Sequence, residues 1–172
     1  MVQKLISTMF ITKLLGYLMI LNLNKEQNMD NCSFEVVWRD SNEDLLELKI
    51  EVITEFVVMH QYCYISSLDL INNMKVIRQH IEQQRSESKI VFGNMTGNFT
   101  PSFSMLFFSK KANDDILVEL DLEIADNNER KHRCQLYVKS KADFWRSFSV
   151  NVEDMVTSND SSKVKLSPYS IK

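Results

Sequence analysis

The sequence predicts an α+β domain: an antiparallel meander sheet of about five to six strands, one amphipathic helix packed across it, and a second, C-terminal helix. Apolar and charged residues alternate along residues 46–52 and 116–124, as in strands with one face in water. Apolar residues recur at helical spacing along residues 70–81 and 144–156. Only 3 Gly and 2 Pro occur in the 172 residues, which disfavours folds with many tight turns, such as a β-sandwich.

The first predicted strands precede the first helix. Residues 33–38 form a short extended run, and a polar turn follows at residues 39–44. The next segment carries the clearest strand pattern, with Leu46, Leu48, Ile50 and Val52 alternating with Glu47, Lys49 and Glu51. Residues 56–65 are rich in Val, Tyr and Phe, so they are predicted to be the next strand of the meander, after a tight turn at Thr54 and Glu55.

The first helix is predicted to begin after Ser66 and to end near Gln84. Ser66 and Asp69 have the spacing of a capping box, in which the Ser hydroxyl accepts a hydrogen bond from a backbone N–H of the first turn. The apolar stripe of this helix consists of Leu70, Ile71, Met74, Ile77 and Ile81. One apolar stripe predicts that the helix lies across the sheet.

Four further segments after this helix are predicted to be extended. Residues 89–92 are a brief strand, and two of the three glycines fall in the principal loop, residues 93–98. Residues 103–108, 116–124 and 133–140 are predicted to be three more strands, of which the middle one alternates most regularly.

The chain is predicted to close with a helix that begins at about Ala142. Its apolar residues at helical spacing are Phe144, Trp145, Phe148, Val152, Met155 and Val156. Residues 157–172 are rich in Ser and Lys and are expected to be a disordered tail. Residues 29–156 are therefore predicted to form a single domain.

The apolar leader, residues 1–28, has three interpretations. As a membrane helix, residues 5–23 place Lys13 near the centre, which costs about 2.5 to 3.5 kcal/mol. As a signal peptide, the leader has no small-residue cleavage site. Alternatively, translation begins at Met29, because the Lys-Glu pair at residues 25–26 can be encoded by AAGGAG, a bacterial ribosome-binding sequence. The leader is thus a mis-assigned start, a signal or an anchor, and contact with a membrane is expected only if it is translated and retained.

The charge balance excludes a typical nucleic-acid-binding protein. The chain has 20 basic and 23 acidic residues, a net charge of −3. Without residues 1–28 the balance is 17 against 22, which gives −5. The basic residues are scattered along the sequence, whereas binding to phosphates requires them to gather on one face.

Cysteine usage predicts a reducing cytoplasm. Three cysteines, Cys32, Cys63 and Cys134, leave one unpaired in any scheme with a single disulfide, and no pair has CxxC spacing. The alternative location is a membrane or the cell exterior, through the apolar leader. Each thiol is expected to be a small buried apolar group, and Cys63 lies among aromatic residues of a predicted strand.

Catalytic motifs do not occur in the sequence. It contains no Gly-x-Ser-x-Gly turn, no His-Glu-x-x-His helix and no phosphate-binding loop. His132 and Cys134 share a face of a predicted strand, and His60 with Tyr62 is expected on a neighbouring strand, which is at most half of a zinc site. We therefore predict a protein that is not an enzyme and has no metal or other cofactor.

A row of carboxylates is the candidate binding feature. Glu119, Asp121 and Glu123 alternate along one strand, so their side chains share a face at intervals of about 6.6 to 7 Å. With Glu47, Glu51 and neighbouring exposed aromatic residues, this row is predicted to be an anionic surface that docks a basic partner. The alternative is an ordinary solvated face of a sheet.

The order of elements resembles that of small bacterial immunity proteins of the WapI type. The resemblance covers residues 34–156. It consists of a strand pair that ends in Tyr62-Cys63-Tyr64-Ile65-Ser66, an amphipathic helix over residues 67–84, a loop over residues 93–98, antiparallel strands, and a closing helix with Phe144-Trp145-Arg146-Ser147-Phe148. Such proteins neutralise toxins delivered between competing cells, so the resemblance implies a non-catalytic, cytoplasmic, toxin-binding protein. The apolar leader departs from that pattern unless translation begins at Met29.

Three functions follow from these observations. The first is a protein-binding domain that occludes a cognate toxin, with affinity from aromatic residues and association rate from acidic faces. The second is a membrane-tethered or secreted accessory domain. The third is an enzyme of unfamiliar type, which requires a pocket that gathers His60, His132 or Cys134.

Overall fold

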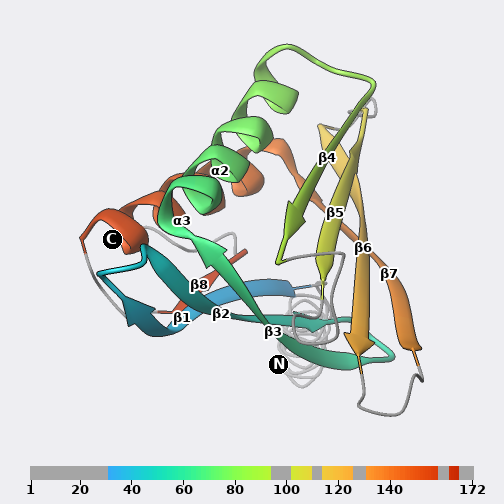
Figure 1. Ribbon diagram of the computed structural model, residues 1–172. Coiled ribbons are helices and arrows are strands. Elements are labelled where there is room, and N and C mark those ends of the chain that lie inside the picture. The colour runs from blue at the N-terminus through green and yellow to red at the C-terminus, as the bar shows by residue number, and fades with distance from the viewer. Residues whose placement is uncertain (1–30, 94–101, 110–113, 126–130, 159–162, 167–172) are drawn as a thin grey trace, which may run out of the picture.

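The computed structural model describes residues 31–93, 102–109, 114–125, 131–158 and 163–166. Within them the chain forms two four-stranded antiparallel sheets, here named A and B, and two helices (Figure 1). The strands of sheet A, in spatial order, are β3 (Val58–Ser66), β2 (Leu45–Ile53), β1 (Asn31–Asp40) and β8 (Lys163–Lys165). Those of sheet B are β4 (Glu87–Phe92), β5 (Phe103–Phe108), β6 (Asp115–Ala125) and β7 (Lys131–Lys141). The helices are α2 (Ser67–Glu82) and α3 (Ala142–Thr157). The predicted α+β class, with antiparallel strands and two helices, is confirmed.

Each sheet is largely a local meander. Strands β1 to β3 and strands β4 to β7 pair in sequence order, and β8 returns from the end of the chain to pair with β1. Helix α2 carries the chain from β3 in sheet A to β4 in sheet B. Periodicity locates strands without assigning them to a sheet. For this reason the sequence predicts one sheet of five to six strands, whereas the described residues form eight strands in two sheets.

The two sheets and the two helices enclose one core. In Figure 1, sheet A lies across the lower part of the molecule and sheet B stands upright beside it, while α2 and α3 lie together on the remaining side. One face of each sheet is therefore turned toward the core, and the outer faces of the two sheets point in different directions.

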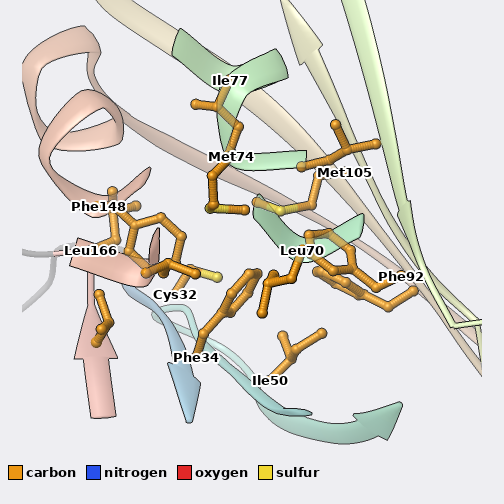
Figure 2. Close-up of a cluster of buried hydrophobic side chains, with 14 of the residues drawn as sticks. Cys32, Phe34, Ile50, Leu70, Met74, Ile77, Phe92, Met105, Phe148 and Leu166 are labelled. Carbon is orange, nitrogen blue, oxygen red and sulfur yellow. The ribbon is translucent and has the colours of Figure 1, made fainter. Parts of the chain in front are cut away.

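Phe34 of β1 lies at the centre of this core (Figure 2). Its ring makes edge-to-face contacts with Phe92 of β4 and Phe148 of α3, with ring centroids 5.3 and 5.0 Å away. Leu70 and Met74 of α2 are fully buried in the same cluster. One side chain thus connects both sheets and α3, so the described elements form a single packing unit.

The predicted alternation of β2 and the predicted Ser66 cap of α2 are confirmed. Leu46, Leu48, Ile50 and Val52 of β2 are buried, while its charged residues are half-buried on the outer face. The Ser66 hydroxyl accepts a hydrogen bond of 3.0 Å from the backbone N–H of Asp69, so α2 begins as the capping pattern predicts. Its buried side chains are Leu70, Met74, Ile77, His80 and Ile81.

His80 joins the end of α2 to sheet B. The side chain is buried, with Nδ1 3.0 Å from the Ser88 hydroxyl of β4 and Nε2 3.0 Å from the backbone oxygen of Phe108 in β5. A carbonyl oxygen only accepts, so Nε2 carries the proton and Nδ1 accepts from Ser88. Burial lowers the pKa of His80, because desolvation disfavours the charged ring. The sequence pattern of α2 does not reveal this role.

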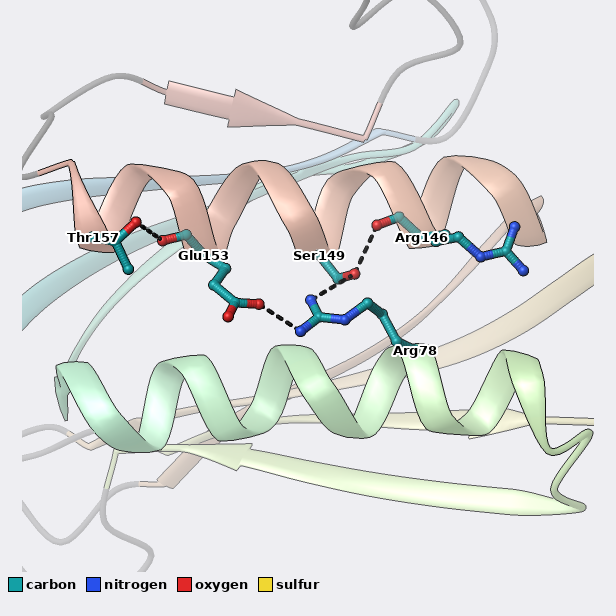
Figure 3. Close-up of polar contacts among 5 residues, drawn as sticks. All are labelled: Arg78, Arg146, Ser149, Glu153 and Thr157. Carbon is teal, nitrogen blue, oxygen red and sulfur yellow. Dashed lines mark hydrogen bonds and ion pairs between the residues drawn. The ribbon is translucent and has the colours of Figure 1, made fainter.

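Polar contacts between α2 and α3 centre on Arg78 (Figure 3). Its guanidinium donates to Glu153 at 2.5 Å and to the Ser149 hydroxyl at 3.4 Å. Ser149 in turn donates to the backbone oxygen of Arg146 at 2.7 Å. Both partners of the ion pair are partly shielded from water, which makes this contact stronger than a fully exposed pair.

The C-terminal end of α3 is held by Arg39 of β1. The guanidinium donates to the backbone oxygens of Met155 at 2.9 Å and Val156 at 3.3 Å. These carbonyls lie in the last turn of the helix, where backbone oxygens lack a partner within the helix and the helix dipole attracts a cation. Arg39 therefore fixes α3 against sheet A.

Two boundaries predicted from the sequence are wrong. The expected disordered tail, residues 157–172, contains β8: the backbone N–H of Leu166 donates to the Cys32 oxygen at 2.7 Å, and Val164 and Leu166 are buried. These two apolar residues complete the inner face of sheet A, although the composition around them is polar. The turn after β2 is also longer than predicted, because Thr54 N–H donates to the Val57 oxygen and β3 begins only at Val58. Residues 159–162 and 167–172 of the tail and the whole leader lie outside the described residues.

Candidate functional site on the outer face of sheet A

The outer face of sheet A displays aromatic side chains between charged ones. Alternation along β3 buries Gln61, Cys63 and Ile65 and therefore exposes the residues between them. Those outward residues are His60, Tyr62 and Tyr64 from β3, beside Glu47, Lys49 and Glu51 from β2. The exposure of this face follows from the alternation, because every second residue of β2 and β3 is buried on the inner face.

Trp38 joins this face because of a β-bulge. The pairing of β1 with β2 shifts between Val36 and Trp38, so Val36 still points into the core while Trp38 lies opposite Glu47. Glu47 lies in turn opposite Tyr64, so the three residues form one row across three strands. The rings of Trp38 and Tyr64 are 6.5 Å apart at an interplanar angle of 86°, with 46% and 37% of each residue exposed.

Away from Glu47, acidic and basic residues of this face lie near one another. Lys163 of β8 lies 2.5 Å from a carboxylate oxygen of Glu51, and this hydrogen bond lowers the pKa of Glu51. Lys49 lies between Glu35 and Tyr62 in the next row. Within the described part of the chain, no ion pair involves Glu47.

The turn between β2 and β3 adds an apolar tip at the far end of the same face. Phe56 is 86% exposed, and Ile53, Val57 and Val58 are exposed beside it. Thr54 holds the turn, since its hydroxyl accepts from the backbone N–H groups of Phe56 and Val57. The exposed Phe56 is thus presented on an ordered turn.

The other predicted acidic residues lie on sheet B, among cations and a phenol. The Arg133 guanidinium donates to Asp121, with an Nε to Oδ1 distance of 2.7 Å, and this hydrogen bond lowers the pKa of Asp121. The Tyr137 hydroxyl donates to Glu119 at 2.7 Å, which raises the pKa of Tyr137. The backbone of Glu123 pairs with that of Arg133, and its side chain lies outside the described ones. The structure therefore divides the predicted acidic residues between two sheets.

The half zinc site suggested by the sequence does not form as expected. His60 belongs to sheet A and Cys134 to sheet B, so they are not on neighbouring strands, and the side chain of His132 lies outside the described ones. In residues that the structure describes, no three His, Cys, Asp or Glu side chains gather as metal ligands do. The spacing of residues along one strand does not predict which other strand pairs with it.

All three cysteines are free thiols, and two of them are buried. Burial raises the pKa of Cys32 and of Cys63 to about 12. Because the thiolate is the nucleophilic form, these two side chains are poorly suited to nucleophilic catalysis. They pack as small apolar groups on the inner face of sheet A.

A hollow of about 680 Å³ lies beside Tyr64, where the ends of β2, β3 and β4 meet the beginning of α2. Its described lining is Leu45, Tyr64, Ile65, Ser66, Asp69, Asn73, Val91 and Gly93. Neither His60 nor Cys134 belongs to that lining, so the hollow gives no support to the enzyme hypothesis built on them.

Neither helix of the described chain has the combination of length and apolar character that crossing a membrane requires. Comparison of the chain with protein-family models, curated proteins and solved structures gave no match.

Proposed function

We propose that this chain is a non-catalytic protein-binding domain that docks its partner on the outer face of sheet A. The observation that carries the proposal is the exposed aromatic pair, Trp38 and Tyr64, held in one row with Glu47, which forms no ion pair within the described part of the chain. Tyr and Trp contribute a large apolar area with few rotatable bonds, and they are enriched in the residues that dominate binding energy.

The extent of the face supports a protein partner. From Val58 to Tyr64 the strand β3 advances six residues, about 20 Å at roughly 3.3 Å per residue. Aromatic or apolar groups lie along this whole length, from the Phe56 tip to Trp38. A small ligand needs a concave pocket that surrounds it, whereas the long outer face of a sheet suits a protein surface.

We further propose that the partner is a cognate bacterial toxin and that the chain is its immunity protein, acting in the cytoplasm. The order of strands and helices that resembles the immunity proteins of the WapI type supports this choice. Inhibition by occlusion requires affinity and no catalytic group, which agrees with thiols buried at a high pKa. Free thiols also suit a reducing compartment.

Rescue in cells tests the proposal. The gene is co-expressed with the large open reading frame immediately upstream, and survival and complex formation are measured. We expect the native chain to rescue growth, and the double variant Trp38→Ala with Tyr64→Ala to lose rescue while it remains folded. The matched control is Tyr137→Ala, which removes an aromatic residue from sheet B that is at least as exposed as Trp38 and Tyr64. The absence of an adjacent toxin and of rescue refutes the immunity role, and full rescue by the double variant refutes the assignment of the surface.

A further inference from the structure

The row of Trp38, Glu47 and Tyr64 combines two kinds of group that attract a cation. The rings meet edge to face, with an interplanar angle of 86°, so their faces point in different directions, and Glu47 lies on the strand between the two strands that carry them. The face of an aromatic ring carries negative charge density and attracts a cation within about 6 Å of its centre. Glu47, which is half-buried, adds a carboxylate to the same row.

Among the residues that the structure describes, no cation forms an ion pair with Glu47. Arg39, next to Trp38 in sequence, is directed to the oxygens of Met155 and Val156 at the end of α3. Lys163 is engaged by Glu51, two rows away. Lys49 is two residues from Glu47 on the same face, yet no ion pair joins them in the described part of the chain.

We propose that Trp38, Glu47 and Tyr64 bind the guanidinium group of an arginine on the protein partner. This inference rests on the proposed function and names the chemistry that the partner must supply. Arginine fits better than lysine, because its planar guanidinium stacks on an aromatic face while its N–H groups donate to a carboxylate, and because it is less strongly hydrated. The arginine then lies near one end of a face whose other end, at Phe56, is apolar.

The test is a titration of the full chain with N-acetyl-arginine amide, followed by the indole N–H resonances in a ¹⁵N spectrum. The chain has two tryptophans, exposed Trp38 and fully buried Trp145, so the second is an internal reference for folding. We expect a saturable shift of the Trp38 resonance and none for Trp145. The uncharged analogue N-acetyl-citrulline amide is expected to give no saturable shift, and N-acetyl-lysine amide a weaker association.

Two variants test whether the binding of arginine amide depends on the row of Trp38, Glu47 and Tyr64. Glu47→Gln is expected to weaken the association with arginine amide about two- to fivefold, the range of an exposed charge pair. Glu119→Gln, on sheet B, is the matched control and is expected to leave the association unchanged. Equal binding of lysine or citrulline amide, or no effect of Glu47→Gln, overturns the inference. No toxin takes part in this titration, so its failure is distinguishable from a failure of the rescue experiment.

Discussion

Removal of the titrating ring at His80 is expected to change how the stability of the protein depends on pH. Neutral His80 donates from Nε2 to Phe108 and accepts at Nδ1 from Ser88, whereas a protonated ring cannot accept from Ser88. The pKa of His80 is lowered in the folded state by burial, while in the unfolded chain it is about 6.5. Between those two pKa values the unfolded state binds more protons, so stability falls as the pH falls.

The magnitude follows from one proton. The contribution of neutral His80 is fully present above about pH 6.5 and is lost below it by at most about 1.4 kcal/mol per pH unit, until the folded pKa is reached. His80→Gln is the matched variant, because its amide retains one donor and one acceptor but does not titrate. His80→Ala removes both hydrogen bonds and the contact with Phe107, and we expect it to cost about 2 to 4 kcal/mol.

Urea unfolding from pH 5 to pH 8 measures these effects. The free energy of unfolding of the native chain is expected to decline below pH 6.5 more steeply than that of His80→Gln, with the two curves parallel above it. The difference between the curves isolates His80 from every other titrating group. An identical pH dependence for both proteins, or a cost below about 1 kcal/mol for His80→Ala, contradicts the buried neutral ring.

Three further predictions concern how the elements are held together. Arg39→Ala is expected to lower the free energy of unfolding by about 1 to 2 kcal/mol, because the last carbonyls of α3 lose a charged donor. Arg39→Lys is the control, and in urea unfolding it is expected to recover part of this loss. A double-mutant cycle of Arg78→Ala and Glu153→Ala is expected to give a coupling of about 1 kcal/mol that shrinks in 1 M salt, and additive effects contradict the ion pair. Leu166→Ala is expected to cost about 2 to 3 kcal/mol, and unchanged thermal unfolding contradicts the placement of β8 in sheet A.

Local features of the fold were predictable from the sequence because their causes are local. The alternation in β2 and β6 reflects one face in water, and the stripe and the Ser66 cap of α2 depend on residues within a few positions of one another. The geometry of the backbone determines that a side chain at position i shares a face with the one at i+2 in a strand, and with those at i+3 and i+4 in a helix. Patterns of this kind therefore predict elements and the faces that they bury.

Other features depend on residues that are distant in the sequence. Val164 and Leu166 form β8 only because β1 offers an unpaired edge more than 120 residues earlier in the chain. His80 is buried because Ser88 and Phe108 meet it from two strands of sheet B, and this burial lowers the pKa of its ring. The periodicity of the sequence cannot predict these contacts, because they join residues that come together only when the chain folds.

The candidate site was predictable in part. Glu47 and Glu51 were expected beside exposed aromatic residues, and the structure places them on one face of sheet A with His60, Tyr62 and Tyr64. Trp38 was missed, because strict alternation from Phe34 and Val36 directs residue 38 into the core. The bulge after Val36 reverses that direction, and its signal in the sequence is only a pair of large apolar residues, Val37 and Trp38, at the end of an alternating strand.

This bulge also separates the proposed binding face from the core. It allows Val36 to fill the core and Trp38, two residues later, to face the solvent, while β3 alternates buried Cys63 and Ile65 with exposed Tyr62 and Tyr64. A side chain on the outer face can therefore change without creating a cavity in the core, and most surface substitutions of this kind alter stability by less than about 0.5 kcal/mol. A domain that must match one particular partner needs such a face, because its recognition residues can then vary while the packing around Phe34 is kept.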